Sequence, residues 1–130
     1  MQRQRGFTVL ELIIAIVILL AAGGIFYVQK RNLEIAKTDS QAKTAINAIY
    51  YNLEDVYFPV NLAYPEHLTA DQLKGLNPAD LKDPSGKAIS DQGSTYRYEP
   101  KDCTSGKCKS YTLTADLQNE GDFVKTNRNQ

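Results

Sequence analysis

The stretch FTVLELIIAIVILLAAGGIFYV, residues 7–28, decides the fold of this chain. From Leu12 to Val28 it has 17 consecutive residues without a charge, Pro, Asn or Gln. As a helix with a rise of about 1.5 Å per residue, residues 7–28 extend roughly 33 Å, enough to cross a bilayer core of about 30 Å. The mean hydropathy of the whole chain is −0.39, so the other residues must be hydrophilic. We therefore expect an apolar helix followed by a water-exposed domain.

Length and charge limit the functions that the chain can have. Its 130 residues provide one small domain. The 15 basic and 15 acidic residues leave no formal net charge, which excludes a global basic field for nucleic acid. Lys101, Lys107 and Lys109 form a local basic group that could contact DNA, but such lysines are more typical of a solvated face. DNA is thus a possible partner that the sequence does not favour.

Two arginines, Arg3 and Arg5, precede the apolar stretch, and this order suits two common kinds of segment. A secretory signal peptide would be removed near the small residues 21–23, Ala-Ala-Gly. A permanent single-pass anchor would keep the two arginines in the cytoplasm, although Lys30 and Arg31 at the other end weaken that orientation.

Glu11 favours a third interpretation. It is the only charged residue between Arg5 and Lys30. A carboxylate deep in lipid costs roughly 2.5–3.5 kcal/mol, and neither a simple signal nor a simple anchor gains from it. A helix that packs against copies of itself could use the carboxylate if a neighbour supplies a positive group.

The segment RGFTVLELI, residues 5–13, resembles the class III signal of type IV pilins and type II secretion pseudopilins. That signal has a short basic leader ending in Gly, then an apolar residue, a Glu at the fifth place after the cleavage, and an apolar helix. Gly6, Phe7 and Glu11 occupy these places. The resemblance implies that a prepilin peptidase removes residues 1–6 by cutting between Gly6 and Phe7. It also implies that Phe7 is N-methylated and that the helix at 7–28 stays in the mature protein.

The resemblance implies a structural protein rather than an enzyme, with no cofactor. We expect a subunit of a type IV pilus-like filament that polymerises through its apolar helix. The alternatives are a major pseudopilin of a type II secretion system or competence pseudopilus, and a membrane-anchored binding module that does not polymerise. Expected partners are further copies of the chain, the prepilin peptidase, the pilus or secretion assembly machinery and the membrane. The protein would span the cytoplasmic membrane once before assembly, and afterwards lie in a surface filament or a periplasmic pseudopilus.

Glu11 has two candidate roles in such a protein. In assembly, its carboxylate would face the amine of Phe7 in a neighbouring copy and fix the axial register of the helices. Within its own helix, it would interact favourably with the dipole of the first turn. Further along, Gly23-Gly24 is either a point where the helix bends or a site of close helix packing, and the sequence leaves both open.

The pattern after residue 28 predicts the soluble domain, residues 29–130. Apolar residues such as Ile46, Ile49 and Leu53 recur at steps of three and four, and charged residues such as Asp39 and Glu54 mark the polar positions. No Pro or Gly interrupts this pattern between residue 29 and Pro59, so one helix is expected from about residue 8 to 58. The domain would comprise an amphipathic helix at 29–58, a loop with short helical turns at 59–93, an antiparallel sheet at 94–127 and a frayed end at 127–130. The fold class is α+β, with a small sheet of three strands packed on the helix.

The loop at 59–93 contains two helix-start signals and one turn signal. Thr69 and Gln72 form a capping box, in which the Thr69 hydroxyl accepts the backbone N–H of Gln72. Asn77 before Pro78 is a second start signal, and residues 83–86, Asp-Pro-Ser-Gly, predict a β-turn.

Cys103 and Cys108 lie at the tip of the predicted hairpin. They could be a reactive pair, a metal pair or a disulfide. Two thiols alone do not make a zinc site, and the short Gly-containing link suits a closed hairpin tip in an exported domain. We therefore predict a structural disulfide.

The remaining residues of chemical interest do not form a catalytic set. Asp116, Asn119, Glu120 and Asp122 offer oxygens that could hold Ca²⁺, as in a comparable loop of some secretion pseudopilins, but these residue types are also typical of a solvated turn. We favour the turn and no metal. His67 has no identifiable nucleophile as partner, so no catalytic residue is expected.

Leader cleavage is the first testable prediction. The mature chain should begin at Phe7 with a methylated amine, and replacement of Gly6 by a bulky residue should leave precursor in the membrane. N-terminal mass analysis of protein from its own cell envelope measures this. A mature terminus at Gly24, or an intact Met1, would contradict the resemblance.

Overall fold

The structure is a computed structural model that describes residues 6–129. Residues 1–5, which make up most of the predicted leader, lie outside the described residues, as does Gln130. The chain divides into two compact units, Met1–Ile35 and Ala36–Gln130.

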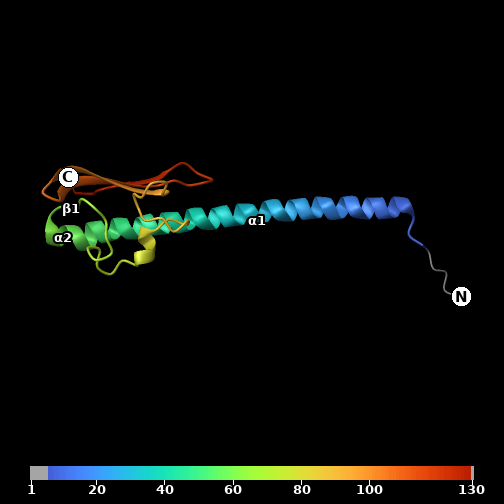
Figure 1. The fold of residues 1–130 in the computed structure, drawn as a ribbon, viewed down its shortest axis with the longest axis horizontal. Coiled ribbons are helices and arrows are strands. Elements are labelled where there is room, and N and C mark those ends of the chain that lie inside the picture. Colours follow the sequence, from blue (N-terminus) through green and yellow to red (C-terminus); the bar gives the residue numbers. More distant parts are fainter. Residues whose placement is uncertain (1–5, 130) are drawn as a thin grey trace. The chain divides into compact units, whose positions relative to one another are not determined.

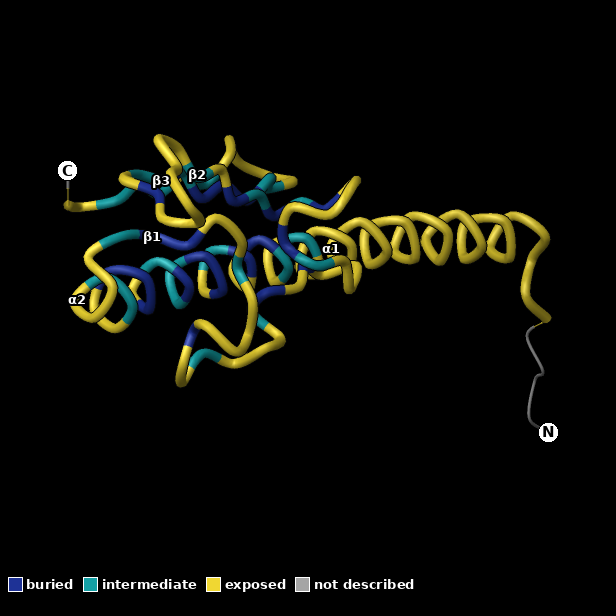
Figure 2. The backbone as a smooth tube through the Cα atoms, turned by 60° about the vertical axis from the view of Figure 1, so that its left-hand side comes forward, coloured by how far each residue is buried: buried dark blue, intermediate teal, exposed yellow. Residues whose placement is uncertain are grey.

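The main helix, α1, spans Val9–Tyr51, and it continues into the π-helix η1 (Asn52–Tyr57) and the short α-helix α2 (Phe58–Asn61). This confirms the predicted long helix, although the helical path ends slightly beyond the predicted residue 58. Pro59 lies at the start of α2, and the helical path ends two residues after it, at Asn61. All residues from 6 to 34 are exposed, and Figure 2 shows that burial begins further along α1.

The soluble unit contains an antiparallel sheet that packs on the helix (Figure 1). Its strands are β1 (Tyr64–Pro65), β2 (Tyr96–Thr104), β3 (Lys107–Ala115) and β4 (Phe123–Thr126). Strand β3 is central, because β2 pairs along one side of it while β1 and β4 pair with different parts of it. The α+β class is thereby confirmed, but the prediction of three strands missed β1. That strand has only two residues and therefore no alternating pattern that a sequence could reveal.

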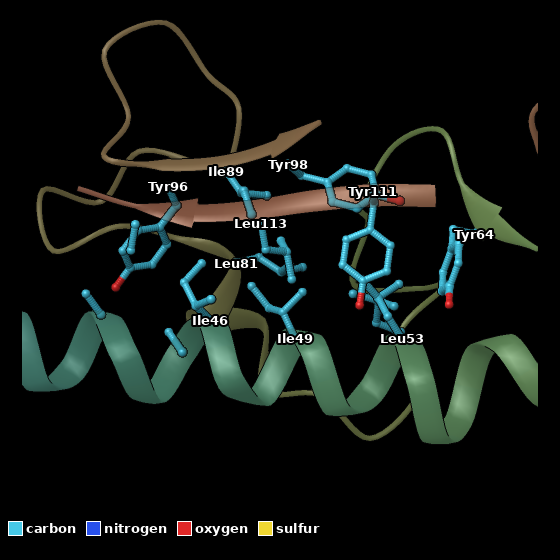
Figure 3. Packing of buried hydrophobic residues seen from close by; sticks show 14 of the residues in the cluster. Ile46, Ile49, Leu53, Tyr64, Leu81, Ile89, Tyr96, Tyr98, Tyr111 and Leu113 are labelled. Carbon is cyan, nitrogen blue, oxygen red and sulfur yellow. The ribbon is translucent and has the colours of Figure 1, made fainter. Parts of the chain in front are cut away.

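The core lies between one face of α1 and the sheet (Figure 3). Ile46, Ile49 and Leu53 point from the helix toward the sheet and are completely buried. Tyr111 and Leu113 of β3 pack onto them from the other side. Burying one such side chain stabilises a fold by about 1.5–3 kcal/mol, so this apolar stripe is what joins helix to sheet. The predicted stripe is confirmed at these three helix positions.

In the segment between the helix and the sheet, one of the two predicted helix starts is present and the other is not. Asn77 caps the 3₁₀-helix η2 (Pro78–Leu81), with its Oδ1 accepting the N–H of Ala79 at 3.0 Å, as predicted. The predicted capping box is wrong, because the N–H of Gln72 bonds to the backbone carbonyl of Thr69 at 3.2 Å and the segment forms only a turn. With no helix following it, the Thr69 hydroxyl has no helical N–H to accept.

Asp83 organises the segment that leads into β2. Its Oδ1 accepts from the hydroxyl of Ser85 at 2.6 Å and from the N–H of Lys87 at 3.0 Å. Its Oδ2 accepts from the N–H of Thr95 at 2.9 Å. Burial opposes ionisation, but these hydrogen bonds outweigh it and lower the pKa of Asp83 to about 2. A single carboxylate thus holds both ends of a surface loop.

Replacing Asp83 by Asn should destabilise the domain by about 1–3 kcal/mol at pH 7, because the amide NH₂ cannot accept the N–H of Thr95. The pKa of Asp83 is lower in the folded than in the unfolded chain, so its contribution is complete above about pH 4 and is lost as the pH falls toward 2. The difference between wild type and Asp83→Asn in urea unfolding should therefore shrink over that range. Asp91→Asn, in an exposed position of the same segment, is the control and should change stability by less than about 0.5 kcal/mol. A pH-independent difference would contradict this role.

Candidate functional site

The predicted cleavage site lies before the helix. Gly6 and Phe7 are outside α1, which begins at Val9, and Phe7 is 80% exposed. The bond between Gly6 and Phe7 therefore takes part in no helical hydrogen bond. A protease needs such an accessible backbone.

Glu11 lies in the first turn of α1 and is exposed. Its backbone N–H donates to the hydroxyl of Thr8 at 3.3 Å, so Thr8 caps the helix start. Within residues 6–129 the Glu11 carboxylate itself has no hydrogen-bond or ion-pair partner. The carboxylate is thus available to a group outside the described chain.

Cys103 and Cys108 form the predicted disulfide. They stand directly opposite each other in β2 and β3, and Ser105 and Gly106 make the turn between them. Gly106 has a φ of 77°, in the left-handed region that glycine adopts without strain. The bond closes the tip of the hairpin one pair of residues before the turn.

The four calcium candidates do not converge on a common point. Arg97 lies 2.7 Å from the carboxylate of Asp116 and 3.5 Å from that of Asp122. Lys43 of α1 lies 2.6 Å from the carboxylate of Glu120. Asn119 uses its backbone N–H to bond α1. In the described part of the chain no group of three or more His, Cys, Asp or Glu side chains could hold a metal ion. The segment is an ion-paired turn.

The site that sequence reasoning missed is the buried carboxylate of Glu54. This residue lies in η1, and its side chain is 0% exposed. Its Oε1 accepts from the hydroxyl of Tyr111 at 2.8 Å and from that of Tyr64 at 3.1 Å. The prediction that Glu54 lies on the polar face is therefore wrong. The available signal was its spacing, because Glu54 lies eight residues after Ile46 and hence on the same apolar stripe.

The two tyrosines around Glu54 are held in the protonated form. Burial and the hydrogen bond to Glu54 raise the pKa of Tyr111 well above its usual value. Burial is also the main reason why the pKa of Tyr64 rises to about 12. Their rings meet edge to face at 4.7 Å. Both hydroxyls are therefore donors to Glu54 throughout the physiological pH range.

The C-terminal residues are fastened to the same carboxylate. The N–H of Arg128 donates to Oε1 of Glu54 at 3.2 Å, and Nδ2 of Asn129 donates to its Oε2 at 3.0 Å. The Arg128 guanidinium also bonds Asp55 at 2.6 Å and lies over the ring of Tyr50 at 5.4 Å. The expectation that this end frays is therefore wrong for residues 127–129. We call residues 127–129 the C-terminal latch: Arg128 and Asn129 bond Glu54, and Oδ1 of Asn127 accepts the backbone N–H of Tyr111 at 3.3 Å.

Asp39 makes a similar connection at the other end of the domain. Its two oxygens accept the backbone N–H groups of Gln118 and Asn119, both at 2.9 Å. These hydrogen bonds lower the pKa of Asp39. The prediction that Asp39 also lies on the polar face is wrong, because Asp39 is 4% exposed and ties α1 to the turn between β3 and β4.

Comparison with known proteins identifies the first part of the chain. Residues 1–27 match the family model of the prokaryotic N-terminal methylation motif, which is the class III prepilin signal. The comparison with curated proteins and that with solved structures found no match. The helix that contains this motif is long and apolar enough to cross a membrane, and its most apolar part is 0% buried. Together these findings support a type IV pilin-like or pseudopilin precursor, and point to a structural protein.

The C-terminal latch generates a stability prediction. Glu54→Gln should lower the free energy of unfolding by about 2–4 kcal/mol, because an amide cannot accept all the donors that surround the carboxylate. Urea unfolding measures the loss, and hydrogen exchange should show the backbone N–H of Arg128, which donates to Glu54, losing protection.

Asp55→Asn is the matched control for Glu54→Gln. It removes only the exposed ion pair with Arg128, so the cost should stay below about 1 kcal/mol. Equal losses from the two variants, or unchanged exchange of the Arg128 backbone N–H in Glu54→Gln, would contradict the role given to Glu54.

Proposed function

We propose that this chain, whose first 27 residues carry the prokaryotic N-terminal methylation motif, is a structural subunit that polymerises into a type IV pilus-like filament. The prepilin peptidase cuts between Gly6 and Phe7 and Phe7 is methylated. The subunit waits in the cytoplasmic membrane until the assembly machinery moves it into the filament. The filament core is a bundle of the helices formed by residues 7–28.

One observation carries this proposal: the apolar stretch at residues 7–28 is exposed throughout, and its one carboxylate, Glu11, has no hydrogen-bond or ion-pair partner within residues 6–129. Leu10 is 69% exposed, Leu20 72% and Phe26 72%. A monomer cannot keep such a surface in water, because apolar area gains about 25 cal/mol per Å² when it leaves water. Lipid covers it before assembly, and the helices of neighbouring copies cover it afterwards.

The charge of Glu11 requires a partner in such a bundle. A buried, unpaired carboxylate is costly, and so is the amine that cleavage creates at Phe7. If Glu11 of one copy faces the Phe7 amine of the next, each charge compensates the other. The pair also fixes how far one helix is displaced along another, which uniformly apolar contacts cannot do.

The soluble unit has the properties of a structural domain. Its buried carboxylates Asp39, Glu54 and Asp83 each accept hydrogen bonds that hold the fold together. The single histidine, His67, is exposed. The three carboxylates therefore serve the stability of the fold rather than catalysis. The disulfide and the C-terminal latch strengthen a domain that lies outside the cytoplasm.

The role of Glu11 is tested by Glu11→Ala. This variant should be inserted and cleaved like wild type but give at least about tenfold fewer filaments, the effect of losing about 1.4 kcal/mol per subunit contact. Glu34→Ala, which removes an exposed carboxylate of the same helix, is the control and should assemble normally. Filament counts by electron microscopy and N-terminal mass analysis give the two readouts.

Normal filament numbers from Glu11→Ala would leave only the local role of Glu11 at the helix start. Absence of filaments from wild type would favour a membrane-anchored module that does not polymerise. Filaments confined to the periplasm would favour a secretion or competence pseudopilus over a surface pilus.

A further inference from the structure

We infer that Phe26, Tyr27, Lys30 and Arg31 form a collar that binds the anionic headgroups of lipids in the outer leaflet of the cytoplasmic membrane. The inference rests on the proposed membrane anchoring of this helix. It assigns a role to two basic residues that the filament proposal does not use.

The position of the collar along α1 follows from helix geometry. A bilayer core of about 30 Å accommodates about 20 helical residues. A membrane-spanning segment that starts at Val9, the first residue of α1, therefore ends near Val28. Lys30 and Arg31 lie two and three residues further, at roughly 3–5 Å along the axis. The headgroup layer occupies about 5–7 Å on each side of the core. Both cations therefore lie at the depth of the lipid phosphates.

Side-chain direction strengthens this placement. In an α-helix the Cα–Cβ bonds tilt toward the N-terminus, so Lys30 and Arg31 lean back toward the membrane. Phe26 lies one turn before Lys30, and Tyr27 one turn before Arg31, on the same faces of the helix. Phe26 is 72% exposed and Tyr27 69%, and Tyr in particular is enriched where a helix leaves the hydrocarbon. On each of these two faces, an aromatic ring thus lies one turn closer to the hydrocarbon core than the cation.

The charge of the collar identifies its ligand. Residues 12–33 contain no acidic side chain, so the nearest carboxylates along the helix are Glu11 at its start and Glu34 a turn beyond Lys30. Within the described residues neither Lys30 nor Arg31 belongs to an ion pair. The apolar stretch next to them lies in lipid, so the anions within reach are phospholipid headgroups. Basic residues are unfavourable on the outer side under the positive-inside rule, and a bound anionic lipid offsets this.

Phospholipid enrichment around the collar can be measured directly. The chain contains no Trp, so Phe26→Trp gives the mature chain one fluorescent reporter at the collar. The protein is reconstituted in phosphatidylcholine vesicles with a minor share of phosphatidylglycerol. In one sample the brominated, quenching lipid is phosphatidylglycerol, and in the other it is the same mole fraction of phosphatidylcholine. At equal mole fraction the anionic lipid should quench about two- to fivefold more strongly, and added salt should reduce this preference.

Variants separate the collar from general attraction between the protein and the vesicle. Lys30→Gln combined with Arg31→Gln should abolish the preference. Lys37→Gln is the matched control, because Lys37 lies seven residues beyond Lys30, about 10 Å further from the membrane, and should keep the preference. Preference that survives in the double variant, or that is lost equally in Lys37→Gln, would overturn the inference.

The same experiment distinguishes failure of the inference from failure of the proposed function. If neither brominated lipid quenches the reporter, the helix is not in the membrane, and both proposals fall. If the two lipids quench equally, the anchoring stands and the collar does not bind anionic lipid. Loss of filaments from the double variant together with equal quenching would assign the two cations to contacts between copies instead.

Discussion

The structure depends on one helix that has to meet two different environments. Up to about residue 28 its side chains, Glu11 excepted, are apolar on every face, which only lipid or other helices can cover. In the soluble unit the same helix has one apolar stripe, and the sheet covers it through Ile46, Ile49 and Leu53. The change occurs without a break in the helix, because neither Pro nor a loop separates the two parts. The organisation of the domain follows from where that stripe begins and ends.

Buried carboxylates fix how the other segments attach to this helix and sheet. Asp39 accepts hydrogen bonds from the turn after β3, and Asp83 accepts them from the loop before β2. Glu54 accepts them from two tyrosines and from the C-terminal latch. Burying a charge is costly, and each of these is compensated by several N–H or O–H donors. Apolar contacts would tolerate many arrangements, whereas a carboxylate accepts only the segment that brings its donors to the right place. Such groups therefore add specificity to a small core.

The first part of the outer edge of β2 is protected against pairing with another chain. Ser90 hydrogen-bonds to the first residues of β2. Its hydroxyl accepts the N–H of Tyr98 and donates to the carbonyl of Tyr98, and its backbone N–H donates to the carbonyl of Tyr96. Pro100, on the same side of the strand, has no N–H to offer. This part of the edge therefore offers few donors to a further strand. Association of copies through their helices, as proposed for the filament, agrees with this arrangement.

The sequence by itself determined the features that depend on neighbouring residues. The apolar length of residues 7–28, the signal at Gly6, Phe7 and Glu11, the helical stripe and the closeness of Cys103 to Cys108 are all local patterns, and spacing alone reveals them. Only the tertiary structure decided which polar residues of the stripe are buried. Glu54 bonds Tyr111 and Arg128, which are 57 and 74 residues away, and Asp39 bonds Gln118, 79 residues away. A charged residue on a helix face looks solvated until its donors are known, and those donors come from segments that only folding brings together.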